Sequence, residues 1–91
     1  MKVIKMEIED FIFEVREELI CYEQVGEQGA DKWVNGFRAW LSNDKPKKNI
    51  TEQKGKSFYL IEDESEIFAI ADEYLEALEN NSVEGYWKTF Q

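Results

Sequence analysis

The first quarter of the chain alternates between apolar and polar residues. Single charged residues separate Ile4, Met6 and Ile8, and a period of two places such apolar residues on one face of a β-strand. Residues 11–15 repeat this alternation less cleanly, and residues 19–24 are rich in residue types that favour strands. The pattern therefore predicts two or three antiparallel strands within residues 2–24.

Part of the same stretch also fits a helix. Apolar side chains recur there at spacings of three and four, at Phe11, Val15, Leu19 and Tyr22. The polar residues 16–18 suit a turn or a helix better than an unbroken strand. Because periodicity does not separate strand from helix in such short apolar runs, both alternatives stay open for residues 11–22.

Two longer segments have the period of amphipathic helices. At 100° per residue, residues 30–42 place their large apolar side chains within an arc of about 120°: Trp33, Val34, Phe37, Trp40 and Leu41. Gly36 lies inside this helix, where it costs about 1 kcal/mol relative to Ala and allows a close approach of another segment.

The second amphipathic helix covers residues 64–79. Its apolar face comprises Ile67, Phe68, Ile70, Ala71, Tyr74, Leu75 and Leu78. Asp63 and Glu66 precede and enter it at the spacing of a capping box, which marks where the helix begins.

The remaining segments complete an α+β fold. Residues 57–62 (SFYLIE) predict a strand, and Val83, Tyr86, Trp87 and Phe90 predict a short C-terminal helix, with a strand as the alternative. We expect an antiparallel sheet, formed by the N-terminal strands and residues 57–62, packed against the two main helices at about 30–42 and 64–79. Ninety-one residues provide for one core, so residues 1–91 are expected to form a single domain.

Charge is distributed unevenly along the chain. The net charge is −9, with −5 in residues 1–30, +4 in residues 31–57 and −8 in residues 58–91. Residues 44–56 hold five lysines, Lys45, Lys47, Lys48, Lys54 and Lys56. Their composition predicts a solvated, mobile loop. The alternatives are a loop that contacts an anion, or one that neutralises the protein's own acidic helix.

The residue types argue against most kinds of catalysis. The chain has no histidine, its glycines do not cluster as a phosphate-binding loop requires, and Cys21 has no partner for nucleophilic chemistry. The acids at residues 62–66 match no calcium-loop spacing. We expect a non-enzymatic protein with no cofactor and no metal, in which Cys21 has a structural role.

Acidic side chains dominate the polar side of the helix at residues 64–79, at Glu66, Asp72, Glu73, Glu76 and Glu79. Like charges at spacings of three and four destabilise a helix by a few tenths of a kcal/mol per pair. An acidic protein has acidic helices for compositional reasons alone. The other interpretation is that these five carboxylates bind a basic partner, with Trp87 and Phe90 as apolar anchors.

The leading functional expectation is a small acidic binding protein of the inhibitor or immunity-protein class, such as a phage-encoded inhibitor, that blocks a basic enzyme acting on nucleic acid. Complementary charge would speed such an association. The excess of acids disfavours direct binding to nucleic acid or to anionic membranes. One cysteine, no signal peptide and no apolar run of roughly 20 residues favour a cytoplasmic location. The alternative is a structural or adaptor module that self-associates, for example as a homodimer, through its aromatic C-terminus.

Overall fold

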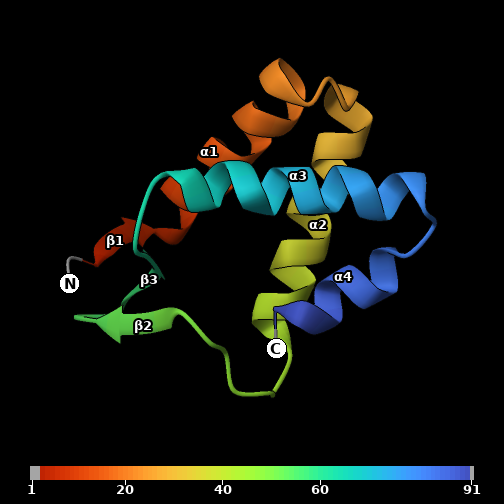
Figure 1. Cartoon of the computed structure of the whole chain (residues 1–91). Coiled ribbons are helices and arrows are strands. Elements are labelled where there is room, and N and C mark those ends of the chain that lie inside the picture. Colours follow the sequence, from red (N-terminus) through yellow and green to blue (C-terminus); the bar gives the residue numbers. More distant parts are fainter. Residues whose placement is uncertain (1–2, 91) are drawn as a thin grey trace.

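The computed structural model describes residues 3–90. Within them an antiparallel three-stranded sheet is combined with helices, which confirms the predicted α+β class (Figure 1). The elements follow one another as β1 (Ile4–Glu7), α1 (Ile8–Glu17), the π-helical turn η1 (Glu18–Tyr22), α2 (Gly26–Ser42), β2 (Ile50–Gln53), β3 (Lys56–Ile61), α3 (Ser65–Glu79) and α4 (Val83–Thr89).

The prediction of two or three strands within residues 2–24 is wrong for most of that stretch. Only β1 is a strand among the described residues there, and α1 and η1 follow it without a break. The helical alternative is correct for Phe11, Val15 and Leu19, all of which are fully buried. Phe13, which the strand pattern would have buried with Phe11, is 58% exposed. The apolar residues spaced by four therefore decide the structure of this segment, and the alternation of apolar and polar residues does not.

The π-helical turn η1 changes the direction of the chain between α1 and α2. The backbone N–H of Glu23 donates to the carbonyl of Glu18, five residues earlier, at 3.0 Å. This wider turn breaks the spacing of four residues, so Tyr22 projects outward and is 71% exposed. Tyr22 does not continue the buried face of α1.

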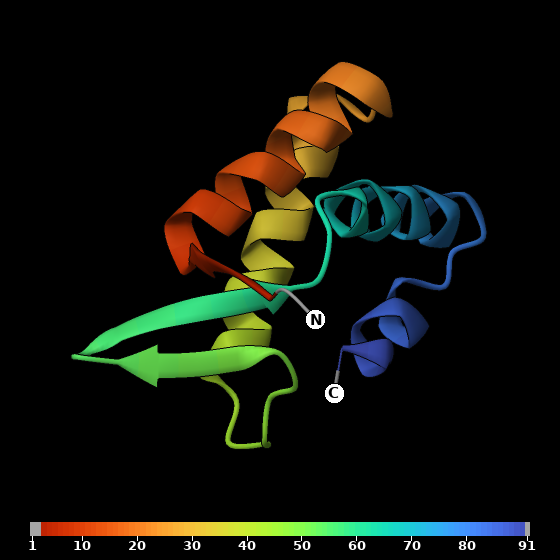
Figure 2. The same ribbon diagram turned by 60° about the vertical axis from the view of Figure 1, so that its left-hand side comes forward.

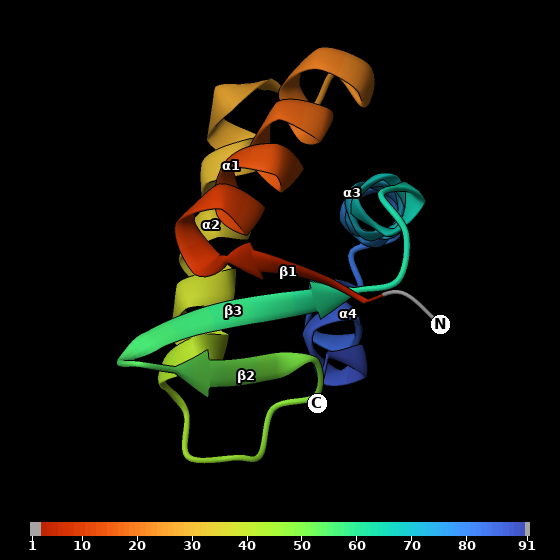
Figure 3. The same ribbon diagram turned by 90° about the vertical axis from the view of Figure 1, so that its left-hand side faces the viewer.

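In the sheet, β3 lies between β1 and β2. Tyr59 of β3 pairs with Met6 on one side and with Ile50 on the other. These three side chains are on the sheet face that packs against the helices, and Figure 3 shows the opposite face of the strands in front of α2 and α4. The sheet is therefore covered on one side, and Phe58 and Lys5 lie on its outer side.

The prediction of a loop over residues 44–56 is wrong at residues 50–53, which form β2 and pair with β3 in a hairpin. Lys54 and Gly55 connect the two strands with φ angles of 51° and 78°, the combination of a type I′ turn. Ile50 is the apolar residue that ties β2 to the core. Residues 44–49 do form a loop, and Lys47 closes it by donating from Nζ to the carbonyl oxygens of Asn43 (2.6 Å) and Lys45 (3.0 Å).

The two main helices are present as predicted, with α2 starting four residues earlier than expected, at Gly26. The cap of α3 is also confirmed. The Asp63 carboxylate accepts a hydrogen bond from the Ser65 N–H at 2.7 Å. The Glu66 carboxylate accepts from the backbone N–H groups of Asp63, at 3.2 Å, and Glu62. These bonds satisfy donors that a helix start leaves unpaired.

Aromatic side chains form much of the core between the sheet and the helices. Phe11 stacks on Tyr59 with ring centroids 3.9 Å apart, and Trp33 stacks on Phe37 at 5.0 Å.

The predicted C-terminal helix is present as α4, which packs beside α3 (Figure 2). Its Tyr86 is buried, and its Trp87 packs on Gly36 of α2, which is the close approach that the glycine permits.

Candidate functional site

Four carboxylates form the exposed side of α3, and we call this set the acidic face: Asp72, Glu73, Glu76 and Glu79. Each is solvent-exposed, and none makes an ion pair or a hydrogen bond within residues 3–90. Glu66, the fifth predicted binding residue, differs from them because its carboxylate caps the start of the helix. The structure therefore brings together four of the five acidic residues predicted from the helical period.

A carboxylate from a distant part of the sequence extends the acidic face. Glu23 follows η1 and lies close enough to α3 that Asp72 and Glu79 act on its charge. Partial burial, followed by the nearby Asp72, Glu18 and Glu79, raises the pKa of Glu23 above its ordinary value. No signal within one helix could have indicated this contact, because roughly 50 residues separate Glu23 from Asp72 along the chain.

Three bases pair with acids on other parts of the surface. The ion pairs found within residues 3–90 are Arg16–Asp31 at 3.2 Å, Arg38–Glu9 at 2.9 Å and Lys56–Glu7 at 3.2 Å. The Arg38–Glu9 pair has two hydrogen bonds, and this contact lowers the pKa of Glu9. All three pairs lie on α1, α2 and the sheet, so none of them neutralises the acidic face.

One lysine of the 44–49 loop does come near α3. Lys48 and Glu73 line the same shallow hollow of about 180 Å³, together with Phe90 and Tyr59. No ion pair joins Lys48 to Glu73 among the described contacts. The lysine loop thus lies close to the part of the acidic face that holds Glu73.

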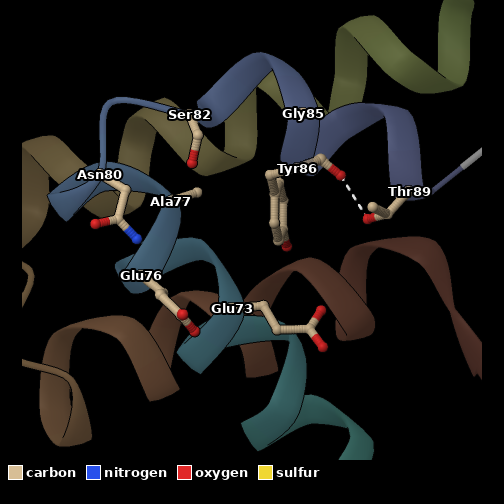
Figure 4. A pocket seen from close by; sticks show the side chains of 8 residues that line it. All are labelled: Glu73, Glu76, Ala77, Asn80, Ser82, Gly85, Tyr86 and Thr89. Atoms are coloured by element: carbon tan, nitrogen blue, oxygen red, sulfur yellow. Dashed lines mark hydrogen bonds between the residues drawn. The ribbon is translucent and has the colours of Figure 1, made fainter.

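A groove of about 370 Å³ runs between α3 and α4, beside the acidic face. Glu73 and Glu76 line it from α3, and Figure 4 shows this stretch of α3 across from Gly85 and Thr89 of α4, with the Tyr86 ring between the two helices. Ala77 adds to the apolar lining, and Asn80 and Ser82 close the end where the chain turns from α3 into α4. The groove therefore combines an apolar floor with two carboxylates at its rim.

No family model, curated protein or solved structure matches the chain. Within residues 3–90 no three His, Cys, Asp or Glu side chains are arranged to hold a metal ion. None of the helices in this range has the length and apolar character needed to cross a bilayer.

Cys21 is exposed rather than packed in the core, contrary to the structural role expected for it. Its thiol lies 3.5 Å from a carboxylate oxygen of Glu17. This contact, with the nearby negative charge, raises the pKa of Cys21. Because the thiolate is the reactive form, the raised pKa lowers the reactivity of the cysteine.

The two predicted apolar anchors, Trp87 and Phe90, are half-buried and pack against the core. The Trp87 ring lies 6.0 Å from that of Trp33, and the Phe90 ring lies 5.3 Å from that of Trp40. Phe68, which was expected on the buried face of α3, is instead 50% exposed. Its position one turn before Asp72 makes it the large apolar side chain next to the acidic face on the same helix.

Proposed function

We propose that this protein is a non-enzymatic binding protein that docks a basic partner on the acidic face of α3. The observation that carries the proposal is the set of four exposed carboxylates, extended by Glu23. None of these five side chains takes part in an ion pair within residues 3–90. A surface of this kind attracts a positively charged protein and raises its association rate.

The arrangement has an energetic cost that binding would offset. Asp72 and Glu76 are four residues apart, and Glu73 and Glu79 are each three residues from Glu76. Each like-charge pair destabilises an exposed helix by about 0.2–0.5 kcal/mol. A basic partner placed over the face replaces this repulsion with attraction, whereas a mixed-charge helix would have avoided the repulsion altogether.

The partner class that fits best is an enzyme that handles nucleic acid. Such enzymes bind phosphate groups through clustered Lys and Arg, and carboxylates spaced along a helix can occupy those positions. Small acidic inhibitors, including immunity proteins of bacterial toxins and phage-encoded inhibitors, block their targets in this way. The proposed setting is the cytoplasm, where such partners are encountered.

Glu76→Lys tests the proposal because it predicts opposite changes in stability and in binding. The substitution turns three like-charge contacts into favourable ones, so the free energy of unfolding should rise by about 1 kcal/mol at low salt. The same lysine would repel a basic partner, and affinity should fall by several-fold to roughly a thousand-fold. Thermal melts and a binding titration with a partner captured from the native host measure both quantities.

Glu52→Lys is the matched control. Glu52 is an exposed carboxylate on the edge strand β2, away from α3, so the same change of charge there should leave binding nearly unchanged. A Glu76→Lys protein that is more stable and binds its partner as well as the wild type would show that the acidic face is only solvated surface.

Self-association through the aromatic C-terminus is the less supported alternative. Trp87 and Phe90 are packed against α2, so only part of each ring is left for a second copy. Sedimentation of the purified protein without any partner would reveal a dimer if this alternative were correct.

A further inference from the structure

We infer that the groove between α3 and α4 receives an arginine side chain of the basic partner. This inference rests on the proposed function and makes it more specific, because it names the residue type that anchors the complex. Three features of the groove support it: the charge at its rim, the chemistry of its floor, and the rigidity of that floor.

The rim of the groove selects a cation. Glu73 and Glu76 lie nearly one turn apart on α3, and no Lys or Arg is among the described residues that line the groove. Lys48 lines only the adjoining hollow that shares Glu73, and none of the ion pairs among residues 3–90 involves Glu76. A neutral occupant would remove water from these carboxylates without replacing the lost hydrogen bonds, which is costly.

The floor of the groove selects a cation with an apolar stem. Ala77 and the Tyr86 ring are buried beneath it, and Gly85 leaves its upper side open. An arginine side chain combines a hydrocarbon stem with a planar head of five N–H donors. The stem would lie on Ala77 and Tyr86 while the head reaches both carboxylates, which a single ammonium group does less well.

The floor is held in place before anything binds. The Tyr86 hydroxyl accepts a hydrogen bond from Trp33 Nε1 at 2.9 Å and donates one to the Ile70 carbonyl at 3.2 Å. Thr89 adds a bond from its hydroxyl to the Tyr86 carbonyl at 2.6 Å. A site whose walls are fixed loses less freedom when it is filled, and binding is correspondingly tighter.

Gly85 allows the groove to be closed without disturbing the core. A Cβ atom added at this position meets no other atom within 4 Å, so Gly85→Leu should fold and place its side chain in the groove. The control is Ala39→Leu, which adds an exposed leucine to α2 without any change of charge. Thermal melts establish that both variants are folded.

The binding test uses a hexa-arginine peptide and its hexa-citrulline counterpart, which has the same shape without the charge. In a two-dimensional amide NMR titration at low salt, hexa-arginine should shift the signals of Ala77, Gly85 and Thr89, and hexa-citrulline should not. Gly85→Leu and the double variant Glu73→Gln/Glu76→Gln should each weaken hexa-arginine binding by about tenfold or more, whereas Ala39→Leu should bind normally.

The outcomes separate this inference from the proposed function. Hexa-arginine that shifts Asp72 and Glu79 but not the groove, with equal affinity for Gly85→Leu, overturns the arginine site and leaves the acidic face as the docking surface. A hexalysine peptide that binds the groove as tightly as hexa-arginine overturns the assignment to arginine. No shift by any cationic peptide at low salt overturns both the inference and the proposed function.

Discussion

At the scale of single residues, the Tyr86 hydroxyl joins three helices. It links Trp33 of α2 to the Ile70 carbonyl of α3 from its own position on α4. Burial raises the pKa of Tyr86 well above that of a free phenol, so the hydroxyl keeps its proton and remains a donor. Buried polar groups in proteins are nearly always paired in this way.

Tyr86→Phe should therefore destabilise the protein by about 1–3 kcal/mol, because it leaves the buried Trp33 N–H without an acceptor. Urea denaturation of the variant and the wild type measures the difference. Tyr22→Phe is the control, since Tyr22 is largely exposed and its hydroxyl should contribute little. Equal stabilities of the Tyr86→Phe protein and the wild type would show that the Trp33 bond is dispensable.

Glu23→Gln should change how stability depends on pH. The raised pKa of Glu23 means that its carboxyl binds a proton more tightly in the folded state than in the unfolded state. Through this group, the free energy of unfolding therefore falls as the pH rises above 4.5, the ordinary pKa of this carboxyl. The variant should be more stable than the wild type at neutral pH and equally stable well below pH 4.5. The lowered pKa values of Glu9 and Asp63 act in the opposite direction, but they are common to both proteins.

Urea denaturation across this pH range gives the difference curve for Glu23→Gln. Glu52→Gln, which removes an exposed carboxylate on β2, serves as the control. A stability difference that does not change with pH would contradict the assigned proximity of Glu23 to Asp72 and Glu79.

At the scale of elements, the contact between α2 and α4 depends on a glycine. A Cβ atom at Gly36 would lie 2.7 Å from Cε2 and 2.9 Å from Nε1 of Trp87, which is closer than such atoms approach. The indole therefore packs directly on the backbone of α2. Gly85 of α4 has no such neighbour, although both glycines lie inside helices.

The same substitution at these two glycines should have opposite effects. Gly85→Ala should stabilise the protein by up to about 1 kcal/mol, because alanine is the better helix former. Gly36→Ala makes the same local gain but displaces Trp87, and a net loss of about 1–3 kcal/mol is expected. Thermal or urea denaturation compares the two. Stabilisation by Gly36→Ala would mean that the indole repacks at little cost.

At the scale of the whole molecule, α4 completes the core that the sheet and the other helices begin. It supplies the buried Tyr86 and the half-buried Trp87 and Phe90. Truncation of a large buried aromatic side chain costs about 3–5 kcal/mol, and small proteins have total stabilities of only about 5–15 kcal/mol. Removal of one buried and two half-buried aromatic side chains thus costs a large part of the whole stability.

A chain that ends at Ser82 should therefore be unfolded or lack cooperative unfolding. Circular dichroism during thermal melting compares it with the full chain, and a synthetic peptide of residues 83–91 added in trans should restore part of the signal. A truncated chain that melts cooperatively would show that α4 is not part of the core, and self-association through Trp87 and Phe90 would become the better interpretation.

Features that depend on a few neighbouring residues were predictable from the sequence. The periods of α2 and α3, the cap formed by Asp63 and Glu66, and the short helix α4 all follow from contacts within one or two turns. The α+β class followed from these elements and the strand at residues 57–62. The four carboxylates of the acidic face were predictable for the same reason, because a helix sets the relative directions of its own side chains.

Tertiary contacts decided the rest. Residues 8–22 are helical because Phe11, Val15 and Leu19 bury themselves together in the core, and β2 is a strand because β3 pairs with it. Which arc of α3 is buried depends on the neighbouring elements, and that choice left Phe68 exposed. The approach of Glu23 and the groove beside α4 join segments distant in sequence. Such features depend on which surfaces the whole chain buries against one another, and no local pattern specifies that choice.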